Sequence, residues 1–242
     1  MNADKETQNQ IPGGLRSSLT IEIHSHYAIR LWEGRSHAKT QIPERKKIFA
    51  VMSMPFLLWR SGIIYRDSLA DNPWADDIMF KVEELIKNSN VIIKDHIHEL
   101  EETLQSLPQN VSFSDIVSSS PLNIGVYCDS PLGYQCVWLL VGYDQMTLKA
   151  FQAYQYGLIN RFQRNELLRN CANQIRRVYS LTHRYRTLKV TRADLFTNTP
   201  KALDAIKKMG YPDTEIIIGK KRSSFSPPLK KVNHSMLNPD NG

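Results

Sequence analysis

The sequence has few cysteines and no long apolar run. Its three cysteines, Cys128, Cys136 and Cys171, form no CxxC pair, so we expect neither a disulfide framework nor a cysteine-based zinc or redox site. No segment approaches the roughly 20 consecutive apolar residues of a membrane-spanning helix. The first 15 residues are polar, unlike the apolar core of a signal peptide. These absences predict a cytoplasmic protein that does not enter a membrane.

Sequence motifs that carry catalysis are also absent. The chain contains no GxxxxGK[ST], GxGxxG, GxSxG or HExxH pattern. His24 and His26, like His96 and His98, stand two residues apart, and two imidazoles supply at most half of a metal site. We therefore predict no metal, no cofactor and no enzymatic activity.

Positive charge is present in excess, and it is concentrated in one stretch. The formal net charge is +7, yet residues 1–159 carry 14 basic and 18 acidic residues. Residues 160–192 carry nine basic residues and one acid, Glu166. The nine are Arg161, Arg164, Arg169, Arg176, Arg177, Arg184, Arg186, Lys189 and Arg192. Such a patch is typical of proteins that bind a polyanion, above all nucleic acid.

The basic stretch overlaps a predicted strand-helix-helix unit at about residues 121–180. Alternating apolar residues over 122–128 predict a half-buried strand, and Ser130-Pro131 predicts the start of a helix that ends near Gly157. Asn160 and Gln163 fit a capping box that begins a second helix, which should run to about residue 179.

The start of this second helix is a predicted phosphate site. Arg161 and Arg164 lie in its first turn, where the helix dipole disfavours cations. An external anion would relieve that conflict and also bond the free amides of the turn. We expect these two arginines to clamp a phosphate group.

The remaining elements are predicted from periodicity and from Gly and Pro positions. They are a strand over 19–23, a short helix over 25–33, a broken or kinked core helix over 48–65 interrupted by Pro55, a long helix from Asn72-Pro73 to Pro108, and a short helix over 200–209. The fold class is therefore mainly α with a few short β-strands. We expect a flexible N-terminal arm at 1–14, a single mostly helical domain at 15–218 and a disordered basic tail at 219–242.

Several short motifs between residues 13 and 222 carry a family resemblance. They are Leu15-Arg16-Ser17, the segment 26–35, Asn72-Pro73-Trp74-Ala75-Asp76, Pro131-Leu132-Gly133-Tyr134 with Tyr143-Asp144, the segment 157–161, and the segment 190–195. In order and spacing they resemble the AcaB-like family of integrating conjugative elements and conjugative plasmids. The resemblance implies a ribbon-helix-helix transcriptional activator of conjugation genes. Such a protein would be a homodimer whose paired strands, one from each subunit, enter the major groove of promoter DNA on the mobile element.

This resemblance and the basic patch together predict which residues contact double-stranded DNA. On the second helix of the unit they are Arg161, Arg164, Arg169, Arg176 and Arg177. Arg176 and Arg177 cannot both face DNA, since neighbours on a helix lie about 100° apart.

Either of the two strands could form the DNA-reading ribbon. The central strand offers Asn123 and Tyr127 and is preferred, while the first strand offers Arg16 and Thr20. The first strand could instead pair with the central one.

A different class of function stays open. The chain could be a non-regulatory protein of the conjugation machinery that binds partner proteins or single-stranded DNA. Aromatic residues interleaved with the basic ones would then stack on bases, namely Phe162, Tyr179, Tyr185 and Phe196. An enzyme would need a pocket with convergent polar groups that no motif announces.

Overall fold

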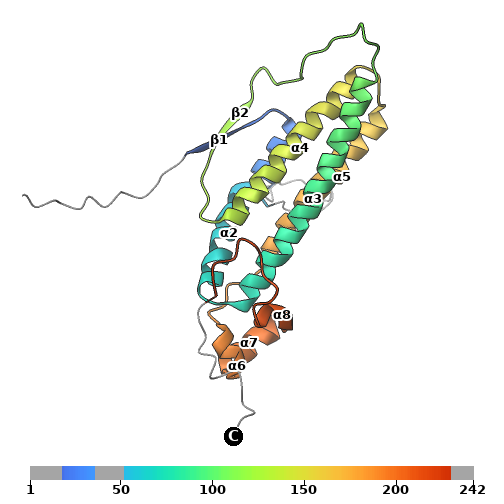
Figure 1. Cartoon of the computed structure of the whole chain (residues 1–242). Helices are drawn as coiled ribbons and strands as arrows, with labels where there is room; N and C mark the ends of the chain where they lie inside the picture. Colours follow the sequence, from blue (N-terminus) through green and yellow to red (C-terminus); the bar gives the residue numbers. More distant parts are fainter. Residues whose placement is uncertain (1–17, 36–51, 230–242) are drawn as a thin grey trace, which may run out of the picture.

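Long helices packed side by side form the body of the molecule, with a small sheet along one side and short helices at one end (Figure 1). The computed structural model describes residues 18–35 and 52–229. In these ranges the elements are β1 (Leu19–Ile23), α1 (His26–Glu33), α2 (Met54–Leu69), α3 (Pro73–Gln105), β2 (Leu122–Val126), α4 (Pro131–Gln155), α5 (Arg161–Arg184), α6 (Arg192–Phe196), α7 (Pro200–Met209) and α8 (Thr214–Ile217). The predicted fold class, mainly α with short strands, is confirmed.

The two strands pair with each other in an antiparallel sheet. Leu19 lies opposite Val126, and Ile23 lies opposite Leu122. The inner face of the sheet is buried at Ile21 and Ile23, because β1 packs against α4. Of the two arrangements left open by the sequence, the pairing of the first strand with the central strand is the one observed.

The core lies where α3, α4 and α5 meet. Ile93 of α3, Leu140 and Met146 of α4, and Ile175 of α5 are almost completely removed from solvent. The link between β1 and α1 is fixed to the same core, since the buried Asp144 carboxylate of α4 accepts the backbone N–H groups of His24 and Ser25, both at 2.8 Å. No helix in the described ranges is long and apolar enough to cross a membrane.

The turn between α4 and α5 follows the sequence signals. Gly157 has φ 73° just after α4, a left-handed conformation that favours glycine. Asn160 Oδ1 accepts the Gln163 N–H at 2.9 Å, and Gln163 Oε1 accepts the Asn160 N–H at 2.8 Å. The predicted capping box is confirmed. The helix continues past the predicted end near residue 179, to Arg184.

The prediction of a broken helix around Pro55 is wrong. α2 runs without interruption from Met54 to Leu69, and Ser53 Oγ caps it by accepting the Phe56 N–H at 3.3 Å. Pro55 lies in the first turn, where its missing N–H group needs no partner, so it begins the helix and does not interrupt it. Residues 48–51 of the predicted helix lie outside the described residues.

The prediction of a disordered tail from residue 219 is wrong for residues 219–229, which pack against α3. Arg222 Nε donates to Asp76 Oδ2 at 3.0 Å, and Ser224 N donates to Glu83 Oε2 at 2.8 Å. Buried carboxylates on α3 thus give this polar segment the partners that fix it. Residues 230–242 of the predicted tail and the predicted arm at 1–14 lie outside the described residues.

Candidate nucleic-acid interface

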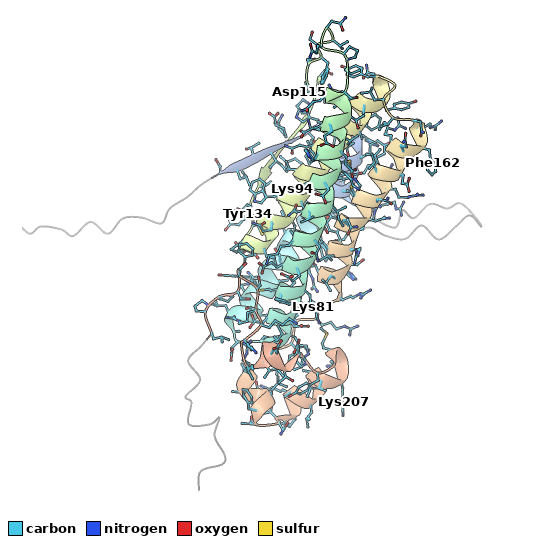
Figure 2. All side chains as sticks on the ribbon, turned by 45° about the vertical axis from the view of Figure 1, so that its right-hand side comes forward. Lys81, Lys94, Asp115, Tyr134, Phe162 and Lys207 are labelled. Carbon is cyan, nitrogen blue, oxygen red and sulfur yellow. The ribbon has the colours of Figure 1, made fainter. Side chains whose placement is uncertain are left out.

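α5 presents a row of arginines to solvent. Its apolar stripe, including Leu168, Cys171 and Ile175, is buried against the core. The opposite side therefore faces outward, and Figure 2 shows side chains projecting from it, with Phe162 near the helix start. The exposed arginines are Arg161, Arg169, Arg176, Arg177 and Arg184.

No carboxylate among the described residues forms a salt bridge with this row. Arg176 Nη1 donates to Asn173 Oδ1 at 3.0 Å, and Arg177 Nη1 donates to Gln174 Oε1 at 3.2 Å. These partners are uncharged amides. Within the described ranges the arginine salt bridges involve residues of α2, α6 and the segment after α8, and none involves α5. Toward the described residues, the row therefore keeps its positive charge.

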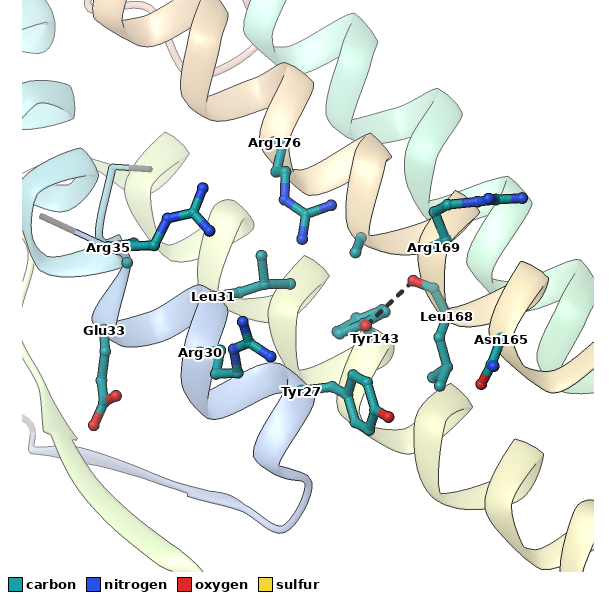
Figure 3. Close-up of a pocket in the computed structure, with 12 residues that line it drawn as sticks. Tyr27, Arg30, Leu31, Glu33, Arg35, Tyr143, Asn165, Leu168, Arg169 and Arg176 are labelled. Atoms are coloured by element: carbon teal, nitrogen blue, oxygen red, sulfur yellow. Dashed lines mark hydrogen bonds between the residues drawn. The ribbon is translucent and has the colours of Figure 1, made fainter. Parts of the chain in front are cut away.

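A groove of about 760 Å³ lies beside this row, between α1 and α5 (Figure 3). Arg30 and Arg35 approach it from α1 and the residues just after it, and Arg176 approaches from α5. In Figure 3 these three guanidinium groups point toward one another over Leu31, while Glu33 points away from them. Arg169 lines the far end of the groove.

The floor of this groove is apolar and buried. Leu31, Leu168 and Ala172 are buried there, together with Tyr143. Tyr143 Oη donates to the Leu168 carbonyl at 3.3 Å, and burial raises the pKa of Tyr143 to about 12. The phenol is therefore neutral at physiological pH, and the groove combines an apolar floor with a cationic rim.

Two further grooves of similar volume also border α5. One, of about 700 Å³, lies against α3 and includes Arg177 and Arg184. The other, of about 730 Å³, lies against the start of α2 and includes Arg35 and Arg184. Arg176 lines all three grooves, so it lies where they meet on the basic surface.

Similarity to known proteins identifies the family of this chain. The family described as transcriptional regulator AcaB matches residues 11–230. The chain belongs to the AcaB family. A crystal structure of selenomethionine-containing AcaB from uropathogenic E. coli is similar over 87% of this chain and 98% of that chain, with a TM-score of 0.52 and 13% sequence identity. At that identity the similarity supports the fold and does not assign site residues. A search of curated proteins gave no match.

The predicted phosphate clamp at the start of α5 is only partly available. Arg164 lies over the rings of Phe151, at 4.7 Å, and Tyr154, at 4.3 Å, in cation–π contacts with the end of α4. The capping box uses the amides of Asn160 and Gln163, which a phosphate would otherwise take. Arg161 remains exposed at the helix start.

The predicted ribbon residues lie on the outer face of the β1–β2 sheet. Thr20 and Asn123 are exposed, and Tyr127, just after β2, is 79% exposed. Glu22 lies directly opposite Asn123 and adds a negative charge to the same face. A hydrogen bond to the Asp129 carboxylate raises the pKa of Tyr127. Arg16 lies outside the described residues.

The two halves of the predicted unit are far apart. α4 has 25 residues, and at 1.5 Å per residue it is about 37 Å long. It separates the end of β2 from the start of α5 (Figure 1). The resemblance to a ribbon-helix-helix protein implied a ribbon with one strand from each subunit, but here both candidate strands belong to one chain and occupy each other's inner edge.

Arg192, counted in the basic patch from the sequence, is buried and does not contribute to it. Its guanidinium group bonds Asp71 Oδ1 at 2.6 Å and Asp76 Oδ2 at 2.5 Å, and it also donates to the carbonyls of Ile216 and Ile217. This arginine joins the short C-terminal helices to α3. Its role is structural.

The aromatic set proposed for single-stranded DNA does not form a stacking surface. Tyr179 is buried and donates to the Leu31 carbonyl at 2.9 Å, and Tyr185 is buried and donates to Asp67 Oδ2 at 2.6 Å. Only Phe162 and Phe196 of the four are exposed. In the described part of the chain, no three His, Cys, Asp or Glu side chains are placed to hold a metal ion.

Sequence reasoning missed Arg30 as a site residue. This arginine lies 139 positions before Arg169 in the sequence, and both line the same groove. Its segment carries a predicted short helix over 25–33 and a family resemblance over 26–35, and neither indicates a binding role. No local sequence pattern indicates that α1 lies beside α5 in the fold.

Proposed function

We propose that this member of the AcaB family is a sequence-specific transcriptional activator of conjugative transfer genes that binds double-stranded DNA as a homodimer. The observation that carries the proposal is the exposed arginine row of α5, which forms no salt bridge with a carboxylate of residues 18–35 or 52–229. Cationic side chains of this kind supply the salt-sensitive part of DNA affinity by neutralising phosphates.

The length of α5 suits a duplex. Its 24 residues span about 36 Å, close to the roughly 34 Å of one turn of B-DNA. Arg161 and Arg184 mark its two ends, with Arg169, Arg176 and Arg177 between them. A convex row of this length can follow the backbone of one strand across a groove, with either Arg176 or Arg177 toward the DNA.

We assign base reading to the outer face of the β1–β2 sheet, where Thr20 and Asn123 offer hydrogen-bonding side chains. In the described residues each strand has one edge paired, which leaves an outer edge at which the strand of a second copy could add. Base reading and backbone binding would then use separate surfaces of the same dimer.

The backbone contact is tested by a double substitution, Arg177→Ala with Arg184→Ala. Both side chains are exposed, so folding should be unaffected, while duplex affinity falls and the slope of log affinity against log salt decreases by about two. Fluorescence anisotropy with a labelled promoter duplex measures both quantities. The matched control, Lys94→Ala with Lys207→Ala, removes the same charge from exposed sites on α3 and α7 and should leave the slope near the unmodified value.

The same assay separates the other parts of the proposal. Thr20→Ala with Asn123→Ala should reduce the preference for promoter over scrambled duplex and leave the salt slope unchanged, because neither side chain is charged. An equal loss of slope in the arginine pair and the lysine control would count against α5 as the backbone contact. A preference for single-stranded over duplex DNA would favour the conjugation-machinery function. A promoter-fused reporter that rises on addition of the protein distinguishes activation from repression.

A further inference from the structure

The groove between α1 and α5 adds Arg30 and a buried floor to the arginines of α5. It is concave, and its volume of about 760 Å³ falls in the range of roughly 300–1,000 Å³ that is common for small-molecule sites. Its floor is made by the buried side chains of Leu31, Tyr143 and Leu168, which a phosphate on the outside of a duplex would not reach.

Cationic groups converge above that floor from two separate elements. Arg30 and Arg35 come from α1 and the residues after it, and Arg176 comes from α5 (Figure 3). α1 and α5 are joined by the hydrogen bond from Tyr179 Oη to the Leu31 carbonyl at 2.9 Å, between buried groups. This bond fixes the backbone that carries Arg30 beside the backbone that carries Arg176, and a fixed scaffold of this kind lowers the cost of binding clustered negative charge.

An apolar floor beneath a cationic rim suits a ligand with two unlike ends. Guanidinium groups bind phosphate oxygens through paired hydrogen bonds, while Tyr27, at the groove wall, and the buried apolar side chains offer a surface for a flat ring. A nucleoside with two or more phosphates has this combination of groups. Simple inorganic anions lack the ring, and neutral nucleosides lack the charge.

We propose that the groove between α1 and α5 is an effector site for a phosphorylated nucleoside of the diphosphate class, and that it shares Arg176 with the DNA-contacting row. The phosphates bind Arg30 and Arg176, and the base lies over Leu31 and Tyr27. Because Arg176 also belongs to the DNA-contacting row, the bound ligand adds negative charge at that row. Occupancy therefore weakens duplex binding.

Isothermal titration of the full chain with ADP, in the absence of DNA, tests ligand binding alone. We expect ADP to bind, adenosine to give no measurable heat, and Arg30→Ala to weaken ADP binding at least tenfold. Arg169→Ala should weaken it less, since that side chain lies at the end of the groove. The control Lys207→Ala, on the distant helix α7, should bind ADP like the unmodified chain. Thermal unfolding of each variant confirms that it is folded.

Absence of ADP binding to the unmodified, folded chain overturns the proposal, as does ADP binding by Arg30→Ala at unchanged affinity. Pyrophosphate binding as tight as ADP binding would overturn the assignment of the base.

A duplex titration of Arg30→Ala tests whether the groove acts as an effector site or as part of the DNA contact. Duplex affinity within about twofold of the unmodified chain, with loss of inhibition by saturating ADP, supports an effector role for the groove. A loss of duplex affinity equal to that of the Arg177 and Arg184 pair would place the groove in the DNA contact instead. Because ADP binding is measured without DNA, its failure leaves the proposed function standing.

Discussion

At the scale of single residues, Arg176 and Arg192 come from the same basic stretch and have opposite roles. Arg176 is exposed and bonded to an amide, whereas Arg192 is 3% exposed and bonded to Asp71 and Asp76. Asp76 also accepts hydrogen bonds from Arg222 and from Ser68. The first arginine is available to a polyanion, and the second holds the C-terminal segment on α3.

Replacing Arg192 tests the structural role. Arg192→Met fills a similar volume and leaves the carboxylate of Asp71 buried without its cation, so we expect the free energy of unfolding to fall by about 3–5 kcal/mol. Urea denaturation followed by circular dichroism measures this change. Arg186→Met, an exposed site in the same stretch, serves as the control, and a surface charge there contributes less than about 1 kcal/mol. Equal small losses in both variants would contradict the assigned role of Arg192.

At the scale of elements, two carboxylates of α3 hold the segment 219–229. One is Asp76, described above, and the other is Glu83. Ser224 donates to Glu83 through its backbone N–H, at 2.8 Å, and through its hydroxyl group, and Lys87 lies 2.9 Å from the same carboxylate. Burial alone would raise the pKa of Glu83, but hydrogen bonds from Ser223, Ser224 and Lys87 outweigh it and lower the pKa to about 2.

Stability should therefore depend on the ionisation of Glu83. Its pKa in the folded chain lies below its ordinary value of 4.5, so the contribution is fully present above about pH 5 and is lost as the pH falls toward 2. Glu83→Gln should be less stable at pH 7, by on the order of 3 kcal/mol, and should lose less stability than the unmodified chain between pH 5 and pH 2.5. Asp95→Asn, an exposed site on α3, is the control. Parallel pH profiles for the unmodified chain and Glu83→Gln would rule this linkage out.

Elements that local residues determine could be predicted from the sequence. The reciprocal pair Asn160 and Gln163, and Gly157 before it, placed the start of α5 correctly because capping involves neighbours in the chain. The prediction for Pro55 was wrong because proline can either interrupt a helix or begin one. The two cases differ in whether the backbone position of the proline would need an N–H donor, and in the first turn of α2 it does not.

The candidate site was predicted less completely than the elements, because it depends on packing. The arginines of α5 could be named from their density in the sequence. Which of them is buried could not, since the carboxylates that bind Arg192 lie 121 and 116 positions away. Arg30 was missed for the same reason, because α1 reaches α5 only in the folded chain.

At the scale of the whole molecule, three surfaces are arranged around one helical core. The arginine row and the groove lie along α5, and in Figure 3 α1 lies between the paired strands and α5. The sheet packs on α4, away from the basic helix (Figure 1). A regulator of this form would bind DNA backbone and DNA bases through different elements, so the strength of binding and its specificity can change independently.

Duplex binding across a salt series, with a promoter fragment from the host element and a scrambled duplex of equal length, tests sequence-specific recognition most directly. We predict tight promoter binding that persists near physiological salt, while binding to the scrambled duplex is lost. Equal and steeply salt-dependent binding to both duplexes would contradict a sequence-specific regulator and would reduce the arginine row to a general surface for polyanions.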